Sequence, residues 1–154
     1  MYFCDAFNIP VVTLTNVKEY AADMQEEKTI SQAVADLTYA FASADVPRIN
    51  VITGEAYGSA YVSMNSKHIG ADLVLALDSA KVGVMDAKVA AQILCEDEIS
   101  QAATKEALEE KAKEFDTLQD GATAAAKRGY VDNVISGSEI RKHLIYALQM
   151  FGMR

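Results

Sequence analysis

The chain has 154 residues, of which 51% are hydrophobic and only two are proline, and this favours one ordered globular domain over a disordered segment. Fourteen basic and 22 acidic side chains give a formal charge of −8, which works against nonspecific binding to nucleic acid or to anionic membranes. No apolar run approaches the roughly 20 residues of a membrane span, and the amino terminus lacks the features of a signal peptide, so we expect a cytoplasmic protein without direct membrane insertion.

The first third of the sequence alternates helical spacing with β-branched runs. Residues 2–8 have the spacing of a short helix, and this abrupt start is typical of a fragment or of one half of a larger unit. The run Ile9–Thr15 predicts a strand with both faces covered, and a polar loop follows it. Residues 29–44 place apolar side chains at helical steps, and Pro47 ends that helix. Residues 48–53 predict a second strand.

The rest of the chain continues the alternation in shorter elements. The patterns predict strands at 72–77, 81–85 and 130–135, and helices at 86–95, 98–119 and 138–151. Asp86 and Ser138 are the predicted N-caps of the first and last of these helices. The order of elements indicates an α/β fold with a recurring strand-strand-helix unit.

The stretch 54–71 is the most informative part of the sequence. It follows the second predicted strand and has helical character up to about Ile69, so it predicts strand, tight turn and helix start. Gly54 and Gly58 allow unusual backbone angles, while Ser59 and Ala60 are small enough for a ligand to approach the first N–H groups of the helix. Such groups can bind an anion or a developing oxyanion. The alternative is that these small residues only let a helix pack closely on a strand.

Side-chain chemistry is sparse elsewhere. His68 and His143 lie in predicted helices outside any recognisable nucleophile motif, and no metal-binding motif is present, so we expect no metal. Cys4 and Cys95 are far apart among apolar neighbours, which predicts two reduced, inert thiols in the core.

Three runs of the sequence resemble one known family. FCDAFNIPVVTLTNV at 3–17, VPRINVITGEAYGSAYVSMNSKHIGADLVLAL at 46–77 and AAKRGYVDNVI at 125–135 are similar to the carboxyl-terminal half of biotin-dependent acyl-CoA carboxyltransferases. That family includes propionyl-CoA carboxylase β subunits, methylmalonyl-CoA decarboxylase α subunits and transcarboxylases. The resemblance implies that residues 1–154 form a single crotonase-like (ClpP/crotonase) domain, a spiral of strand-strand-helix units.

The resemblance also implies an activity. We expect transfer of a carboxyl group between biotin and the α-carbon of a short-chain acyl-CoA, through an enolate held by the backbone amides of Ser59 and Ala60, with Gly58 just before them. Biotin would arrive on a separate carrier protein or domain. The expected partners are an amino-terminal carboxyltransferase domain or subunit, which shares the active site, a biotin carboxyl carrier protein, and further copies in a homo-oligomer built on dimers or trimers.

Further residues are expected around this turn by the same resemblance. Val62 falls where the family varies a residue facing the acyl pocket, so an apolar side chain there would help to set acyl length; the alternative is core packing. The residues expected to bind substrate or biotin are Tyr57, Tyr61, Val62, Val17, Lys18, Glu19 and Tyr20.

The sequence departs from the family pattern at two places. Residues 17–20 read Val-Lys-Glu-Tyr where the family commonly has Val-Pro-Gly-Phe, and residues 85–90 read Met-Asp-Ala-Lys-Val-Ala where it usually has Met-Gly-Ala-x-Gly-Ala. Lys18 and Glu19 are expected near the turn at Gly58. Two alternatives therefore remain open: an assembly subunit that has lost the biotin pocket, or a hydratase or isomerase of the crotonase type that uses Glu55 as its acid.

Overall fold

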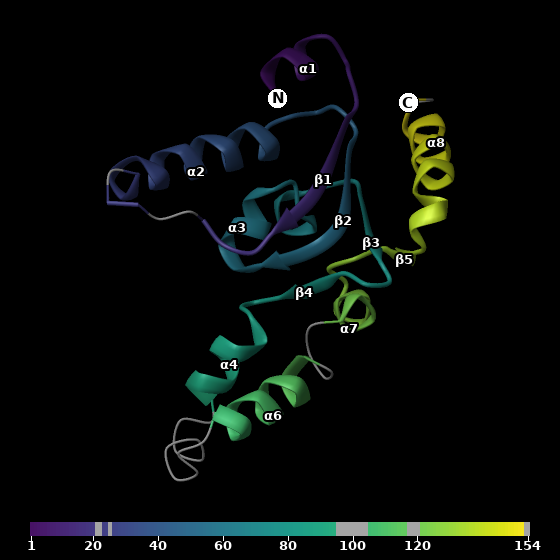
Figure 1. Ribbon diagram of the computed structural model, residues 1–154. Helices are drawn as coiled ribbons and strands as arrows, with labels where there is room; N and C mark the ends of the chain where they lie inside the picture. Colours follow the sequence, from purple (N-terminus) through teal and green to yellow (C-terminus); the bar gives the residue numbers. More distant parts are fainter. Residues whose placement is uncertain (21–22, 25, 95–104, 117–120, 153–154) are drawn as a thin grey trace.

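The computed structural model describes residues 1–20, 23–24, 26–94, 105–116 and 121–152 (Figure 1). Within these ranges helices and strands alternate around one sheet, which confirms the predicted α/β class. The elements in chain order are α1 (Tyr2–Ala6), β1 (Val11–Val17), α2 (Glu27–Ala42), β2 (Arg48–Tyr57), α3 (Gly58–Ser63), η1 (Lys67–Ile69), β3 (Leu73–Leu77), β4 (Lys81–Gly83), α4 (Ala87–Leu94), α6 (Lys105–Phe115), α7 (Ala122–Lys127), β5 (Asn133–Ile135), η3 (Gly137–Glu139) and α8 (Ile140–Phe151).

The long strand β2 organises the sheet. The strand order is β1-β2-β3-β5, β4 also pairs with β2, and each of these pairings is parallel. Residues 49–52 of β2 pair with β3, whereas residues 55–57 pair with β4. Val17 at the end of β1 lies opposite Ala56, and Gly83 at the end of β4 lies opposite Tyr57. The carboxyl ends of β1, β2 and β4 therefore meet at one place.

Helices α3 and α8 lie on opposite sides of β2 (Figure 1), and alternate residues of β2 pack toward these two layers. Ile49 and Val51 pack with side chains of α8, while Ile52 packs in a cluster that includes residues of α3 and α7. The prediction that both faces are covered therefore fits β2. It is wrong for β1, the edge strand, because Leu14 pairs with Val51 but remains 64% exposed.

Strand β2 extends further than the sequence pattern predicted, and Gly54 lies inside it rather than in a turn. Next to Gly54 the pairing of β1 is irregular, and the Asn16 Oδ1 atom accepts a hydrogen bond from the Glu55 N–H group at 2.9 Å. A Cβ atom on Gly54 would lie 2.5 Å from that Oδ1 atom. Glycine at this position makes room for the Asn16 side chain.

Helix α3 ends at Ser63, earlier than the predicted end near Ile69. Asn65 follows with a left-handed backbone conformation (φ 54°), and its buried amide donates to Thr13 Oγ1 at 3.2 Å and to the Ile49 carbonyl at 3.4 Å. These bonds tie the chain to the sheet just after α3, where the short helix η1 replaces the predicted continuation.

Helix caps are partly as predicted. Asp86 accepts a hydrogen bond from the Lys88 N–H group at 2.9 Å at the start of α4, which confirms its role as N-cap. The predicted cap Ser138 lies inside η3, and Ser136 instead forms a capping box with Glu139. The cap lies two residues earlier because a turn of 3₁₀ helix precedes α8.

Cys4 is partly exposed on α1, so the prediction of a core thiol is wrong for this residue. The apolar neighbours that predicted burial are themselves exposed, because α1 lies at the edge of the fold. Cys95 lies outside the described residues. Among the helices of the described ranges, none is long and apolar enough to cross a membrane.

Candidate functional site

The turn at Gly58 lies where the carboxyl ends of β1, β2 and β4 meet. Gly58 has φ +57°, and a Cβ atom there would lie 3.0 Å from the Val84 carbonyl oxygen, so both conformation and space favour glycine. Helix α3 begins at this residue. The amides of Ser59 and Ala60 lie in its first turn, where N–H groups have no acceptor within the helix. Ligand sites in parallel sheets commonly lie at such strand ends.

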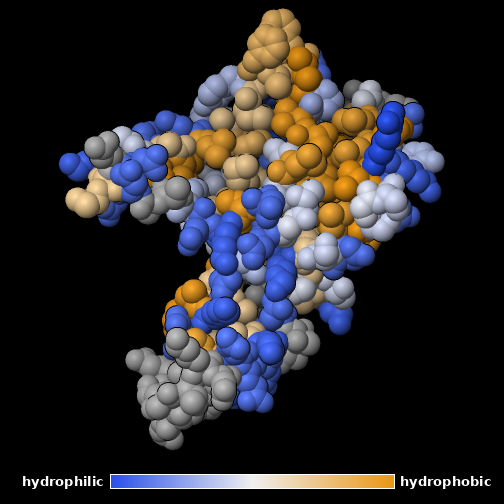
Figure 2. All heavy atoms as spheres, in the orientation of Figure 1, coloured by the Kyte–Doolittle hydropathy of each residue, from blue (hydrophilic) through white to orange (hydrophobic). Residues whose placement is uncertain are grey.

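A cavity of about 490 Å³ opens beside this turn. We call it the charged cavity, because Lys18, Glu19, Asp86 and Lys88 line it; its full lining is residues 18–20, 57–60, 84–86 and 88–89. The cavity therefore brings together the predicted oxyanion turn and both segments that depart from the family pattern. Hydrophilic side chains gather across the middle of the face in Figure 2, between the body of the sheet and the α4–α6 pair.

A second cavity, of about 540 Å³, shares Gly58, Ser59 and Val84 with the first. We call it the aromatic cavity. The His68 ring lies 4.8 Å from the Tyr130 ring and meets the Tyr61 ring edge-on at 6.1 Å, measured between centroids. Its full lining is residues 58–59, 61–62, 82–84, His68, Arg128 and Tyr130. One turn of backbone thus borders two cavities of different chemistry.

An ion pair joins the two segments that depart from the family pattern. Lys18 Nζ lies 2.9 Å from Asp86 Oδ2, with side chains 49% and 25% exposed. The hydrogen bond and charge of Asp86, with a smaller contribution from Glu55, raise the pKa of Lys18 above its ordinary value. The hydrogen bonds from Lys18 and from the Lys88 N–H group lower the pKa of Asp86. Both groups are therefore charged at neutral pH.

Tyr20 ties the same loop to α3. Its hydroxyl donates to the Ser59 carbonyl oxygen at 3.0 Å and lies 2.7 Å from the Ser63 hydroxyl. Residues 18–20, which we call the strap, are therefore held at Lys18 by an ion pair and at Tyr20 by hydrogen bonds.

Tyr61 is only 3% exposed and packs in the core cluster beside the aromatic cavity. In the part of the chain that the structure describes, its hydroxyl has no hydrogen-bond partner. Burial, with a smaller effect of the Asp132 charge, raises the pKa of Tyr61 to about 12. The phenol therefore stays protonated at neutral pH and is no candidate for a general base.

Most of the site residues predicted from the sequence border one of the two cavities. Tyr61 and Val62 line the aromatic cavity, whereas Val17 lines neither and packs against the core instead. Glu55, the acid of the hydratase alternative, lies in β2 and is not among the residues that line these two cavities. His143 lies on α8, also outside them.

Sequence reasoning missed Arg128, Tyr130 and Val84 as lining residues. The first two belong to the run AAKRGYVDNVI, so its match to the family was the available signal. Val84 had no local signal, since it borders the turn only because β4 pairs with β2. In the described ranges, no group of three or more His, Cys, Asp or Glu side chains is arranged to hold a metal ion.

The family profile described as "Carboxyl transferase domain" matches residues 1–152. The chain is 45% identical to the propionyl-CoA carboxylase beta chain of Saccharopolyspora erythraea, covering 96% of this chain and 28% of that protein. It is 37% identical to the methylmalonyl-CoA carboxyltransferase 12S subunit of Propionibacterium freudenreichii subsp. shermanii, covering 99% and 29%. The chain thus spans less than a third of the length of these relatives.

Solved structures agree with the sequence relatives. A transcarboxylase 12S structure, described as a hexamer with methylmalonyl-coenzyme A and methylmalonic acid bound, superposes with a TM-score of 0.93 at 37% identity and covers 99% of this chain and 30% of its own. The β subunit of P. aeruginosa geranyl-CoA carboxylase shares the fold with a TM-score of 0.83 at 20% identity, over 98% of this chain and 30% of its own. These neighbours are carboxyltransferases, and the predicted crotonase-like fold is confirmed.

Proposed function

The chain belongs to the carboxyl transferase domain family, and we propose that it forms the biotin-facing half of a biotin-dependent acyl-CoA carboxyltransferase. The reaction moves a carboxyl group between biotin and the α-carbon of a short-chain acyl-CoA of the propionyl/methylmalonyl or acetyl/malonyl type. The observation that carries this proposal is the convergence of residues 18–20, 57–60, 84–86 and 88–89 on one cavity beside the start of α3.

Carboxyl transfer at an α-carbon needs stabilisation of negative charge on the thioester oxygen. N–H groups that point at this oxygen before the reaction can stabilise the enolate without any side-chain nucleophile. In our proposal the amides of Ser59 and Ala60 do so, and Gly58 sets the turn that presents them. The left-handed conformation of Gly58 and its close approach to Val84 support this assignment.

The charged cavity has room and polar groups for the ring of biotin. Bound biotin supplies the ring nitrogen that carries the carboxyl group. The proposed holders are Tyr57 and the strap residues Lys18, Glu19 and Tyr20, all of which line this cavity. The biotin itself would be attached to a separate carrier protein or domain.

The aromatic cavity is the proposed acyl side of the site. Val62 is partly buried and lines this cavity together with Val82 and Val84, so its size affects the space open to an acyl chain. This arrangement supports the hypothesis that Val62 helps to set acyl length, rather than only packing in the core.

The chain requires a partner in this proposal. It spans less than a third of the length of its relatives, and large apolar side chains in and next to α1 and β1, among them Phe3, Phe7 and Leu14, are exposed. Hydrophobic surface is visible near α1 and toward α8 in Figure 2. An amino-terminal carboxyltransferase domain or subunit would complete the active site, in a homo-oligomer served by a biotin carboxyl carrier protein.

The ion pair between Lys18 and Asp86 favours an adapted enzyme over a subunit that has lost its biotin pocket. Two positions that drift independently have no physical reason to become complementary, yet these two side chains lie 2.9 Å apart.

A reconstituted transfer reaction tests the proposal. The chain, its amino-terminal carboxyltransferase half and a biotinylated carrier are mixed, and carboxyl transfer from malonyl-CoA or methylmalonyl-CoA to biotin is measured. We expect transfer with at least one of these substrates. An intact assembly that transfers nothing from any short acyl-CoA, but binds the carrier, would support the assembly-subunit alternative, whereas hydration of an enoyl-CoA would support the hydratase alternative.

A further inference from the structure

The strap lines the charged cavity and contacts two parts of the fold beside the oxyanion turn. At one end, Lys18 pairs with Asp86 at 2.9 Å. At the other end, the Tyr20 hydroxyl donates to the Ser59 carbonyl oxygen at 3.0 Å. Ser59 is also a residue whose amide we propose as an oxyanion donor. The strap is therefore connected through Ser59 to the backbone amides that must be positioned for the reaction.

Asp86 has two simultaneous partners. One carboxylate oxygen accepts the Lys88 N–H bond at 2.9 Å at the start of α4, and the other contacts the Lys18 ammonium. The cap orients the carboxylate toward the strap, and the strap in turn is fixed relative to α4. Residue 84, whose carbonyl lies against Gly58, is only two positions before Asp86. The ion pair thus links the strap, which contacts Ser59, to the segment 84–86, which contacts Gly58.

The four charged side chains that line the cavity balance one another. Glu19, Asp86, Lys18 and Lys88 line the cavity, and Glu55 lies near enough to raise the pKa of Lys18 further. Ion pairs this exposed contribute little to global stability because water and salt screen them. An effect on local geometry is therefore a better account of the pair than an effect on folding.

We propose that the Lys18–Asp86 pair is a positioning device for the oxyanion turn: it holds the strap against the start of α4, and Tyr20 transmits that position to Ser59. In this role Lys18 and Asp86 act through the backbone of α3; a contact between Lys18 and biotin is a separate role, which would change the KM for the carrier and not kcat. The inference rests on the proposed function for its catalytic meaning. The contacts that hold the strap and the turn involve only residues 18–20, 57–63 and 84–88.

Removal of one partner at a time tests the device in the full assembly. Lys18→Met keeps most of the side-chain length without the charge, and Asp86→Asn removes the charge but retains an N-cap oxygen. We expect each single variant to lower kcat by about two- to fivefold, because an exposed ion pair can shift the position of the turn by no more than its own small interaction free energy. The KM for acyl-CoA should change by less than about twofold, because the acyl side is bordered by other residues.

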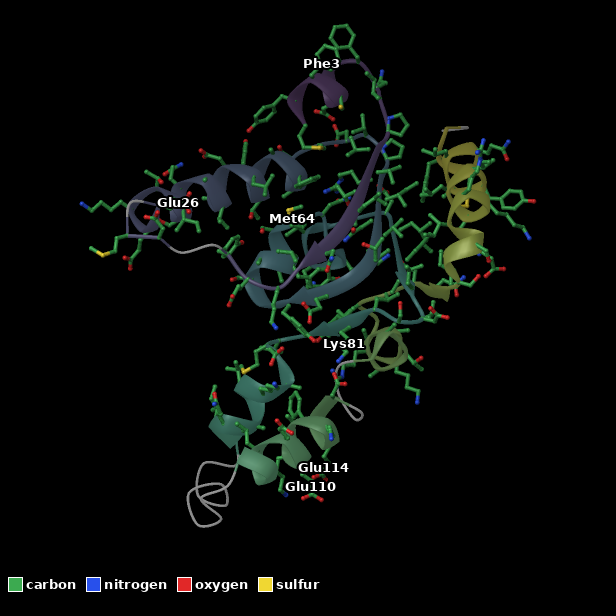
Figure 3. All side chains as sticks on the ribbon, viewed as in Figure 1. Phe3, Glu26, Met64, Lys81, Glu110 and Glu114 are labelled. Atoms are coloured by element: carbon green, nitrogen blue, oxygen red, sulfur yellow. The ribbon has the colours of Figure 1, made fainter. Side chains whose placement is uncertain are left out.

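The double variant and two controls separate positioning from independent damage. Lys18→Met with Asp86→Asn should lower kcat no further than either change alone, because both remove the same interaction. Lys18→Arg keeps the cation and should retain most of the activity. Lys111→Met removes another surface lysine, the partner of Glu114 at 3.8 Å, and should leave kcat unchanged. Figure 3 labels Glu114 on α6.

Amide hydrogen exchange across residues 57–63 gives a readout that does not depend on catalysis. We expect faster exchange in Lys18→Met and in Asp86→Asn with an unchanged melting temperature. If the wild-type assembly transfers no carboxyl group but the two variants still exchange faster than wild type, the positioning device is supported and the carboxyltransferase proposal is refuted. Unchanged exchange and unchanged kcat in both single variants, or losses that multiply in the double variant, would overturn the inference.

Discussion

The charged cavity and the aromatic cavity share Gly58, Ser59 and Val84 but are held together by different forces. The rim of the charged cavity includes a solvent-exposed ion pair. The wall of the aromatic cavity is made of packed rings, with Tyr61 almost fully buried. Salt and charge substitutions should therefore affect the first cavity, whereas changes of side-chain volume should affect the second. Variants of the shared turn should affect both.

The largest effect is expected at the shared turn. Ser59→Pro removes the Ser59 N–H group, which lies in the first turn of α3 and has no acceptor within the helix. We expect kcat for carboxyl transfer to fall by about 100-fold or more, as for loss of one oxyanion donor. Ser59→Ala keeps the amide and should retain kcat within about twofold of wild type. Equal losses in both variants would show that the hydroxyl, and not the amide, is required.

Gly58→Ala should disturb both cavities by destabilising the turn itself. The left-handed φ of +57° and the Val84 carbonyl oxygen 3.0 Å from a new Cβ atom both oppose a side chain. We expect a loss of about 1–2 kcal/mol in the free energy of unfolding, measured with urea. Gly121→Ala is the matched control, because nothing lies within 4 Å of its Cβ position and its φ is −69°. A smaller loss in the free energy of unfolding for Gly58→Ala than for Gly121→Ala would contradict the conclusion that the turn at residue 58 requires glycine.

Val62→Ala should alter the aromatic cavity alone. The smaller side chain leaves room for a longer acyl chain, so kcat/KM for butyryl-CoA relative to propionyl-CoA should rise about tenfold, the effect typical of one methylene. Val89→Ala, which lies on the charged cavity, should leave this ratio unchanged. An unchanged ratio in Val62→Ala would assign that residue to core packing.

Tyr61→Phe should stabilise the fold on the aromatic side. The buried hydroxyl has no hydrogen-bond partner among the described residues, so its removal relieves an unsatisfied polar group. We expect a gain of about 1 kcal/mol in the free energy of unfolding and no change in kcat. A loss of stability or of activity would instead identify a partner for the hydroxyl in the complete assembly.

The smallest effect is expected from pH on the charged side. The lowered pKa of Asp86 means that the pair is lost only as pH falls through a value below 3.8, and the raised pKa of Lys18 means that it is lost only as pH rises through a value above 10.5. The ratio of wild-type to Lys18→Met kcat should therefore stay constant between about pH 6 and pH 9. A ratio that varies within this window would show that another group titrates against Lys18.

Local sequence was sufficient where structure depends on near neighbours in the chain. The spacing of apolar residues predicted α2 and α8. Asp86 was correctly identified as a cap because its carboxylate accepts a hydrogen bond from the Lys88 N–H group, only two residues away in the chain. The turn at Gly58 was also recognised, since a glycine before small residues and a helical pattern is a local signal. The exact cap of the last helix was missed, because 3₁₀ and α turns have nearly the same sequence preferences.

Tertiary structure decided the features that depend on sheet order. Gly54 was predicted to belong to a turn, but it lies in β2, where the distant Asn16 side chain needs the space. The sequence placed Lys18 near the turn by resemblance, yet its pairing with Asp86 had no local signal. That pair exists because β1 and β4 both align with the carboxyl-terminal end of β2. The sequence by itself determined the turn and its amides, whereas the parallel sheet decided which distant charges surround them.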